Sequence, residues 1–293
     1  MVNKFIHWGL VMSKKAFTMV ELLAVVAILG IISSIAYPKI INVIGNSRLT
    51  AYNVSKKNIV DSAKLKYLAD VNSSIVTEYT VPDLVKDGYI KDSAKNPLTD
   101  QEYDKNTKVL ITNDNGDISY NYVEGNTIYD LVKNKNNNSN VYNENDEYVY
   151  KGKNAQNYVV FNGDIYRIIK VDKFRHTYLI RETNDVINKN DIENYINYYN
   201  NDNFNENAAN KMWGKTEILT NVLYKQTILN GSSFINVDNN VWLKDEDTYK
   251  VITINNEFTN DEKANMFIVI KLNNNVVITS GEGTQINPYV VED

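Results

Sequence analysis

The chain has 293 residues, of which 43% are apolar, and its formal net charge is −5. It contains no cysteine, which excludes disulfides, thiolate nucleophiles, cysteine-ligated metal centres and a lipoprotein anchor. It has only two histidines, His7 and His176, so a three-histidine metal site is excluded as well. The acidic balance argues against a phosphate-binding surface spread over the whole molecule.

An apolar segment near the N-terminus, residues 17–36, reads FTMVELLAVVAILGIISSIA. At roughly 1.5 Å per residue, a helix of this length spans about 30 Å, the thickness of the hydrocarbon core of a bilayer. Lys14 and Lys15 precede the segment, and the positive-inside rule keeps that end in the cytoplasm. The pattern predicts a transmembrane helix with everything after Ala36 outside the cell.

Glu21 is the one acidic residue in this segment. A carboxylate inside a membrane is costly, so such residues are usually paired and functional. A simpler interpretation places Glu21 at the headgroup boundary, where it is merely tolerated. The residues around it distinguish the two interpretations.

These residues, KKAFTMVELL, resemble the N-terminal processing signal of type IV prepilins and pseudopilins. The resemblance implies a leader of residues 1–16 that includes Lys14 and Lys15. It also implies that prepilin peptidase cuts between Ala16 and Phe17 and N-methylates Phe17. The family usually has glycine at the cut, where this chain has Ala16.

The resemblance extends to assembly. It implies that Glu21 neutralises the terminal amine of a neighbouring subunit, so that the pair sets the register of a fibre. Gly30 and Pro38 fall where many pilin helices carry these residue types. The implied partners are the membrane, prepilin peptidase, other pilin or pseudopilin subunits, and an assembly ATPase with its platform.

Three alternatives concern the same segment. Ser34-Ile35-Ala36 before Tyr37 resembles an ordinary signal-peptidase site, which would discard the apolar run. A second alternative is a permanent single-pass anchor that never assembles. A start at Met12 is the third, and it would give the shorter leader MSKKA.

A helical pattern continues beyond the membrane segment, because apolar residues recur three and four apart to about Ala69. The spacing predicts one helix over 17–69, bent or locally melted near Pro38, whose outer half lies on a sheet. This arrangement matches the pilin architecture, in which a protruding helix carries a globular head.

The first part of the head is predicted at residues 70–132. Residues 81–90 favour a short helix ended by Gly88, and residues 96–99 favour a turn. These two stretches resemble LVKxGYI and NPLT segments of small Gram-positive pilin-like proteins. Runs 108–112 and 117–122 flank an Asn-Gly pair and predict a β-hairpin. The turn residues are also a candidate calcium site through carboxylate and amide oxygens, although turn chemistry explains them fully; they are Asn113, Asp114, Asn115 and Asp117.

An asparagine-rich tract at residues 133–147 reads as a polar linker and as the best domain boundary. A mixed α+β domain with a twisted antiparallel sheet is expected at residues 148–293. The strands are predicted at 157–161, 164–171, 176–181, 241–243, 250–254, 266–272 and 275–278, and the helices at 191–199 and 208–223. The fold class is therefore α+β, with a long N-terminal helix, a small hairpin head and this additional domain.

The C-terminal residues TSGEGTQINPYVV and the segment YVVFNGDIYRIIKV resemble a C-terminal domain found on pilin-like proteins of Firmicutes and Mollicutes. That organisation is similar to lectin-like folds. The glycines have an ordinary explanation as a tight loop before a last strand. Trp213 and Trp242 are candidates for stacking on a ligand, with core packing as the alternative for each.

These features predict a structural subunit and no enzyme, cofactor or resident metal. The expected function is a type IV pilin-like or pseudopilin subunit of a Gram-positive surface fibre that serves secretion, DNA uptake in competence, or adhesion. The size of the head favours a minor subunit that displays a C-terminal binding domain. A surface-binding protein outside any fibre and a tethered hydrolase are the alternatives. Because no stripe of Lys and Arg accompanies the aromatic residues, no nucleic-acid partner is predicted.

Overall fold

The computed structural model describes residues 18–70, 75–92, 94–135, 140–183, 186–200, 213–233 and 239–292. These residues form two compact units. The described part of the first unit comprises residues 18–55 and 97–99, and the second unit comprises the other described residues. The long N-terminal helix begins in the first unit and ends in the second.

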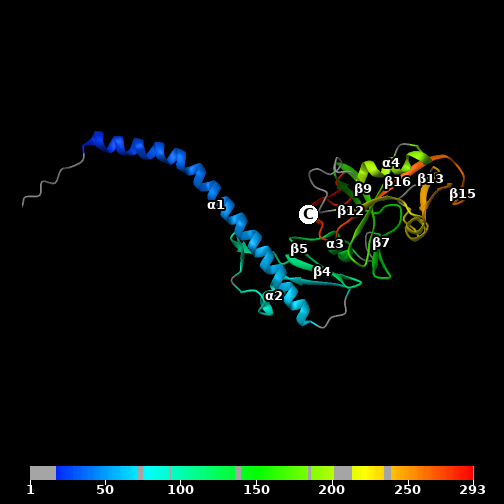
Figure 1. Cartoon of the computed structure of the whole chain (residues 1–293), viewed down its shortest axis with the longest axis horizontal. Coiled ribbons are helices and arrows are strands. Elements are labelled where there is room, and N and C mark those ends of the chain that lie inside the picture. Colours follow the sequence, from blue (N-terminus) through cyan, green and yellow to red (C-terminus); the bar gives the residue numbers. More distant parts are fainter. Residues whose placement is uncertain are drawn as a thin grey trace, which may run out of the picture. The chain divides into compact units, whose positions relative to one another are not determined.

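This helix, α1, covers Met19–Ala69 and is 51 residues long (Figure 1). The predicted helix over 17–69 is confirmed from Met19 onward. The helix was expected to be bent or locally melted near Pro38; the backbone stays helical there, so the melting alternative is wrong. An interior proline removes one hydrogen bond, and helix-forming residues on both sides supply enough others to keep the helix continuous.

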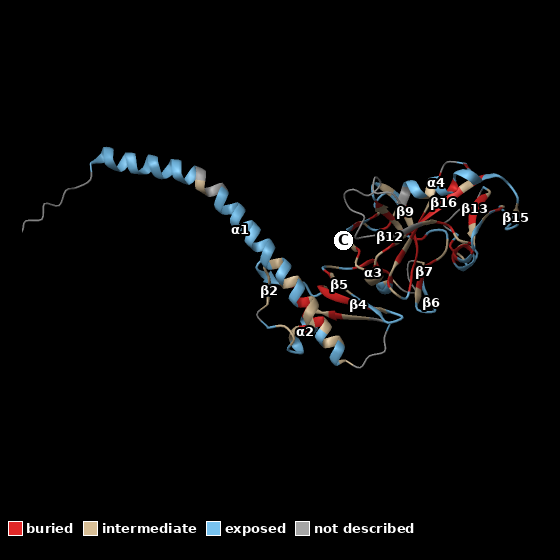
Figure 2. Cartoon of the chain, in the orientation of Figure 1, coloured by how far each residue is buried: buried red, intermediate tan, exposed pale blue. Residues whose placement is uncertain are grey.

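The first unit exposes its apolar side chains, and Figure 2 shows this part of α1 almost entirely in the colour of exposed residues. Leu22, Leu29 and Ile32 are all more than half exposed. Among the described residues, α1 alone is long and apolar enough to cross a membrane. The surface is therefore suited to lipid or to other helices, because water disfavours so large an apolar area.

The second unit contains a three-stranded antiparallel sheet in the order β1-β4-β5. Its strands are β1 (Val76–Thr80), β4 (Lys108–Asp114) and β5 (Asp117–Val123). The last turns of α1 pack on this sheet: Ile59 and Ala63 are buried against Tyr79 and Val109. The expectation that the outer half of the helix lies on a sheet is confirmed for its last turns only, since residues 41–51 are exposed.

Beside this sheet, α2 (Val81–Lys86) follows β1, and β2 (Lys95–Asn96) pairs with β3 (Gln101–Glu102). Thr80 caps α2 by accepting a 3.1 Å hydrogen bond from the Asp83 amide. The helix ends before Gly88, as predicted, because Gly88 takes a φ of 79°, which favours glycine.

The tract at 133–147 is not a free linker in its described part. Helix α3 (Ile128–Asn134) runs into it, and β6 (Val141–Glu144) and β7 (Glu147–Tyr150) form a hairpin. Val141 and Tyr150 are fully buried, and β7 also pairs with β9. In the described part of the tract, Asn143 is exposed and Asn145 lies in the hairpin turn, while apolar residues such as Val141 fill the core.

The rest of the second unit is built around a 13-stranded, mostly antiparallel sheet with the main order β15-β14-β13-β16-β10-β9-β8-β18-β17. Strands β11 and β12 pair with β16, and β6 joins through β7. The strands after β7 are β8 (Tyr158–Phe161), β9 (Asp164–Val171), β10 (Thr177–Glu182), β11 (Ile187–Asn188), β12 (Trp213–Ile218), β13 (Val241–Asp245), β14 (Thr248–Ile252), β15 (Phe258–Thr259), β16 (Lys263–Leu272), β17 (Val277–Ser280) and β18 (Tyr289–Glu292).

The α+β class and the predicted strands of this domain are confirmed. The helix expected over 208–223 is wrong at residues 213–218, while its first residues, 208–212, lie outside the described part of the chain and its last residues, 221–223, are helical. Residues 213–218 form β12, which pairs antiparallel with the ten-residue strand β16. Gly214 weakens a helix here, and β16 offers unpaired backbone groups that a strand satisfies. The described helical segments are η1 (Lys189–Asp191), α4 (Ile192–Asn200), α6 (Asn221–Leu223) and the π-helix η3 (Tyr224–Ile228).

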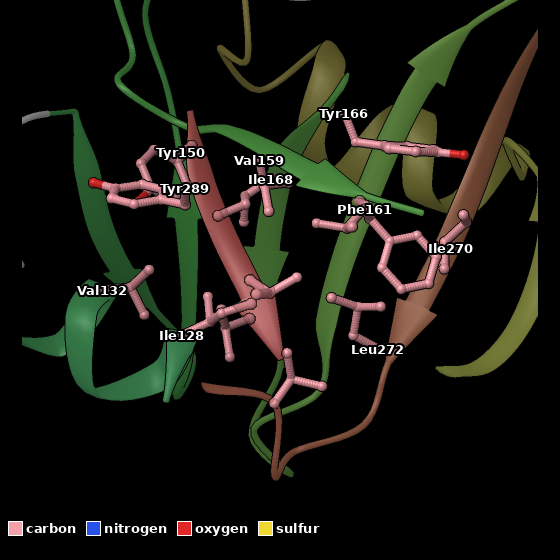
Figure 3. Packing of buried hydrophobic residues seen from close by; sticks show 14 of the residues in the cluster. Ile128, Val132, Tyr150, Val159, Phe161, Tyr166, Ile168, Ile270, Leu272 and Tyr289 are labelled. Atoms are coloured by element: carbon pink, nitrogen blue, oxygen red, sulfur yellow. The ribbon is translucent and has the colours of Figure 1, made fainter. Parts of the chain in front are cut away.

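The largest core cluster lies between α3 and the strands around β8, β9 and β18, as Figure 3 shows. Ile128 and Val132 of α3 pack against Tyr150, Val159 and Ile168, and all of them are at most 1% exposed. Full burial of one such aliphatic side chain contributes about 1.5–3 kcal/mol. Helix α3 is therefore part of the large sheet's core, although it follows the small sheet in sequence.

The glycine loop before β18 is structural. Gly283 has a φ of 76°, and a Cβ atom there would lie 2.3 Å from the Tyr289 ring. A Cβ on Gly281 would lie 2.0 Å from the Pro288 carbonyl oxygen. Because only glycine fits both places, the ordinary explanation of this motif, a tight loop leading into a last strand, is confirmed.

A buried chain of charges joins the small sheet to the large one. Arg175, in the β9–β10 turn, bonds Glu78 of β1 at 2.7 Å, and Lys108 of β4 reaches the same Glu78 oxygen at 3.0 Å. Lys108 also bonds Asp130 of α3 at 2.7 Å. The side chains of Lys108 and Arg175 are 6% and 9% exposed. Two buried cations are thus balanced by two carboxylates that remain partly exposed.

Neutral contacts reinforce this junction. The Asn274 amide donates to the Thr112 hydroxyl at 2.8 Å and accepts a 3.0 Å hydrogen bond from Asn121. The Ile278 amide donates to the Asn126 carbonyl oxygen at 2.9 Å. The small sheet and the large sheet are therefore parts of one compact unit, with directional bonds between them.

Candidate assembly site at the start of the N-terminal helix

The N-terminal helix begins with a reciprocal cap made by two residues. The Thr18 amide and hydroxyl both donate to Glu21 Oε2 at 2.8 Å. The Glu21 amide in turn donates to the Thr18 hydroxyl at 3.2 Å. This is a capping box, in which a Thr and a Glu three residues apart satisfy each other's backbone amides.

The cap fixes a carboxylate in the first turn of an otherwise apolar helix. Glu21 is the only acidic residue between positions 18 and 60. Its negative charge is favourable at a helix N-terminus, where unpaired amides leave a partial positive charge. Both hydrogen bonds from Thr18 use one carboxylate oxygen, Oε2, and the residue is exposed. The group can therefore accept a cation without loss of its cap.

Of the other residues predicted for processing and assembly, the structure describes only some. Lys14, Lys15, Ala16 and Phe17 lie outside the described residues. Gly30 lies within α1, and a Cβ atom there would meet nothing within 4 Å in the isolated chain.

Pro38 lies in the helical backbone of α1, and its side chain is not among the described ones. The described part of the chain therefore contains Glu21, Gly30 and the backbone of Pro38 on one continuous helix.

The candidate calcium residues form the turn between β4 and β5. Asn115 and Gly116 have φ angles of 52° and 96°, as a two-residue hairpin turn requires. The Gly116 amide donates to Asn113 Oδ1 at 2.9 Å, and Asn115 donates to Asp114. No group of three acidic or histidine side chains suited to a metal ion occurs among the described residues. Asp117, opposite Asp114 in the hairpin, is exposed.

The two tryptophans named as possible ligand platforms have different outcomes. Trp242 is 1% exposed, and its indole N–H donates to the Ile187 carbonyl oxygen at 2.8 Å. It is a core residue, so the ligand-platform interpretation is wrong for it. Trp213 begins β12, and its side chain lies outside the description.

Sequence reasoning missed the residues that join the two sheets. Arg175 occupies a left-handed backbone position with a φ of 69°, and the Asp172 carboxylate organises its turn by accepting from the Phe174 and His176 amides at 2.9 Å. His176 Nδ1 lies 3.3 Å from Asp172. Burial opposes ionisation of Asp172, but its hydrogen bond to His176 and the charge of that ring outweigh burial and lower the pKa of Asp172.

Comparison with known proteins adds one finding. The family model described as the prokaryotic N-terminal methylation motif matches residues 11–37. No curated protein and no solved structure matches the chain. The motif supports a type IV pilin-like protein.

Several consequences follow from this match. The motif implies processing by prepilin peptidase and assembly with other pilins, and it indicates a structural subunit. Together with the apolar helix α1, it indicates anchoring in a membrane. The match ends before the small sheet begins, so it gives no information about the two sheets of the second unit.

Proposed function

We propose that this chain is a type IV pilin-like subunit that prepilin peptidase cuts between Ala16 and Phe17 and that enters a surface fibre through α1. The proposal rests on three features that occur together at the start of α1. A helix with exposed apolar side chains has one carboxylate in its first turn, at Glu21, within the matched methylation motif.

The proposed role of Glu21 follows from charge pairing. Cleavage creates a positively charged amine at Phe17, and a cation in an apolar environment requires a counter-charge. The carboxylate at Glu21 is exposed and capped through one oxygen, so it is available to the amine of a neighbouring subunit. Leu, Val and Ile side chains along α1 supply contact without fixed register, while the ion pair sets the axial position.

The processing step is tested by N-terminal sequencing and mass spectrometry of the surface-exposed form. We expect an N-methylated Phe17 at the start of the chain. A chain that begins at Tyr37 would identify an ordinary secreted protein and overturn the proposal. A full-length chain that retains Lys14 and Lys15 would identify an uncut membrane anchor instead.

The assembly step is tested with Glu21→Gln, which keeps the shape of the side chain and removes its charge. We expect normal membrane insertion and processing, but loss of the protein from sheared surface fibres. Asp61→Asn is the matched control, since Asp61 lies on the same helix, is about half exposed and pairs with Lys64 at 3.3 Å. Equal fibre levels for wild type and Glu21→Gln would contradict the proposed pairing.

We also propose that this subunit is a minor one that displays its C-terminal domain at the cell surface. The second unit carries a 13-stranded sheet in addition to the small sheet on which α1 packs, so each copy adds considerable bulk to a fibre. Immunogold labelling of purified fibres tests this. Sparse or terminal labels are expected, and dense, evenly spaced labels would show a major subunit.

A further inference from the structure

A cleft of about 470 Å³ lies where the β4–β5 hairpin meets two loops of the large sheet. Asp114, Asp117 and Asn121 line it from the hairpin, His176 from the β9–β10 turn, and Asn274 from the β16–β17 loop. Its volume falls in the range of small-molecule sites, about 300–1,000 Å³. The cleft lies within the second unit and is distinct from the helix start.

The chemistry of the lining defines a class of ligand. Carboxylate, amide, hydroxyl and imidazole groups line this cleft, and its lining includes neither lysine nor arginine among the described residues. Two carboxylates without a cation repel phosphate and nucleic acid. Amides both donate and accept, and carboxylates accept, so the set complements hydroxyl groups, each of which donates and accepts as well.

Bonds made before any ligand arrives hold the polar groups in place. Asn274 is 5% exposed and is fixed by Thr112 at 2.8 Å and by Asn121 at 3.0 Å. His176 is held through Nδ1 by Asp172 at 3.3 Å. Residues Asp114 and Asp117 face each other across the hairpin turn. A preorganised site loses less entropy on binding than one whose side chains must be ordered.

We propose that this cleft binds a neutral saccharide unit through its hydroxyl groups. Asp114 and Asp117 accept hydrogen bonds from adjacent hydroxyls, while Asn121 and Ser119 provide further polar contacts. Because the hairpin and the large sheet both contribute, the site depends on the contacts that join the two sheets, among them those of Glu78 with Arg175 and of Asn274 with Thr112. Binding requires no fibre, so it stands or falls separately from the proposed assembly.

The test uses the full chain purified in detergent micelles and saturation-transfer NMR with the methyl glycosides of glucose, galactose and mannose. At least one is expected to bind with a dissociation constant on the order of 1 mM, because a ligand of this size has little surface to bury. A glycan array with the same protein then distinguishes a free sugar from a unit within a surface glycan.

Variants locate the site. The double variant Asp114→Asn, Asp117→Asn is expected to weaken binding about tenfold, since it removes two charged acceptors. Ser119→Ala reports on the same cleft without a change of charge and is expected to weaken binding less. Asp247→Asn is the matched control, because Asp247 is an exposed acid in the turn between β13 and β14. Thermal melting verifies that each variant is folded.

Three outcomes overturn the proposal. No response from any neutral glycoside with folded wild-type protein excludes a saccharide site. Unchanged affinity in the folded double variant places binding elsewhere. Binding of CaCl2 or of glucosamine, with no neutral sugar bound, shows that the carboxylates serve a cation instead.

Discussion

The two units of this chain differ in the partners that they give to a glutamate. In the first unit the apolar side chains are exposed, and Glu21 is held by Thr18, three residues away on the same helix. In the second unit apolar side chains are buried, and Glu78 is held by Arg175 and Lys108 from distant segments. Local hydrogen bonds leave Glu21 open to a partner outside the chain, whereas tertiary contacts give Glu78 its partners within it.

This difference indicates what each charge does. A carboxylate in an apolar setting needs a cation, and the first unit provides none next to Glu21 among the described residues of its first three turns. The proposed partner is the terminal amine of another subunit, which is the proposed basis of assembly. Arg175 and Lys108 already surround Glu78, so that its role is to hold the second unit together.

The largest expected loss of stability comes from a substitution in the chain of charges between the two sheets. Glu78→Gln leaves Arg175 and Lys108 buried without their shared counter-charge, and we expect it to lower the free energy of unfolding by about 3–5 kcal/mol. Urea unfolding of the full chain in detergent, followed by tryptophan fluorescence, measures this. Glu257→Gln, at an exposed position, is the control. Equal stability of the two variants would remove the contrast between the glutamates.

A second substitution compares the two parts of α1. Ile59 is 3% exposed and packs on the small sheet, whereas Ile41, in the first unit, is 48% exposed. Ile59→Ala is expected to cost about 2–5 kcal/mol in the same unfolding experiment, because it leaves a cavity. Ile41→Ala should leave unfolding of the second unit unchanged. A similar loss from both would mean that the parts are not energetically distinct.

Acid should weaken the second unit. Burial alone would raise the pKa of Glu78, but Arg175 and Lys108 outweigh it and lower that pKa. A carboxyl whose pKa is lower in the folded state stabilises the fold fully above its unfolded pKa of about 4.3 and loses this contribution as the pH falls through the folded value.

Urea midpoints of wild type and Glu78→Gln, measured from pH 7 down to pH 3, test this linkage. The wild type should lose stability more steeply below about pH 4.3, so that the two curves converge. Parallel curves would show that Glu78 does not titrate differently in the folded and unfolded states.

The smallest expected loss of stability comes from removing a threonine helix cap, and it is compared between the two units. Thr80 caps α2 in the second unit, so Thr80→Ala should lower the unfolding free energy by about 1 kcal/mol. Thr18→Ala removes a similar cap from the first unit and should leave unfolding of the second unit unchanged. A melting shift caused by Thr18→Ala would show coupling between the helix start and the second unit.

The helix and the hairpins could be predicted because their causes are local. Apolar spacing over 17–69 defines a helix whatever surrounds it, and Asn-Gly at 115–116 and 162–163 takes the φ angles of a tight hairpin turn. The helix predicted at 213–218 was wrong for the opposite reason. Its residues do not specify a strand strongly, and the free edge of β16 decided its conformation.

The processing motif could be recognised from the sequence because the pattern from Lys14 to Glu21 is contiguous, whereas the assembly role of Glu21 stays a prediction. The polar tract at 133–147 was misjudged because composition averages over positions. A hairpin needs only a few buried residues, here Val141 and Tyr150, and its two asparagines, Asn143 and Asn145, are compatible with an exposed face and a turn.

By itself, the sequence determined the helix, the single carboxylate of its apolar segment and the processing motif, since each depends on neighbours along the chain. Only the tertiary structure decided which charges pair and where a cleft opens. Glu78, Lys108, Asp130 and Arg175 come from four separate segments and show no pattern that links them in sequence. Burial makes Lys108 and Arg175 depend on the two carboxylates, because a charge removed from water is stable only beside its partner.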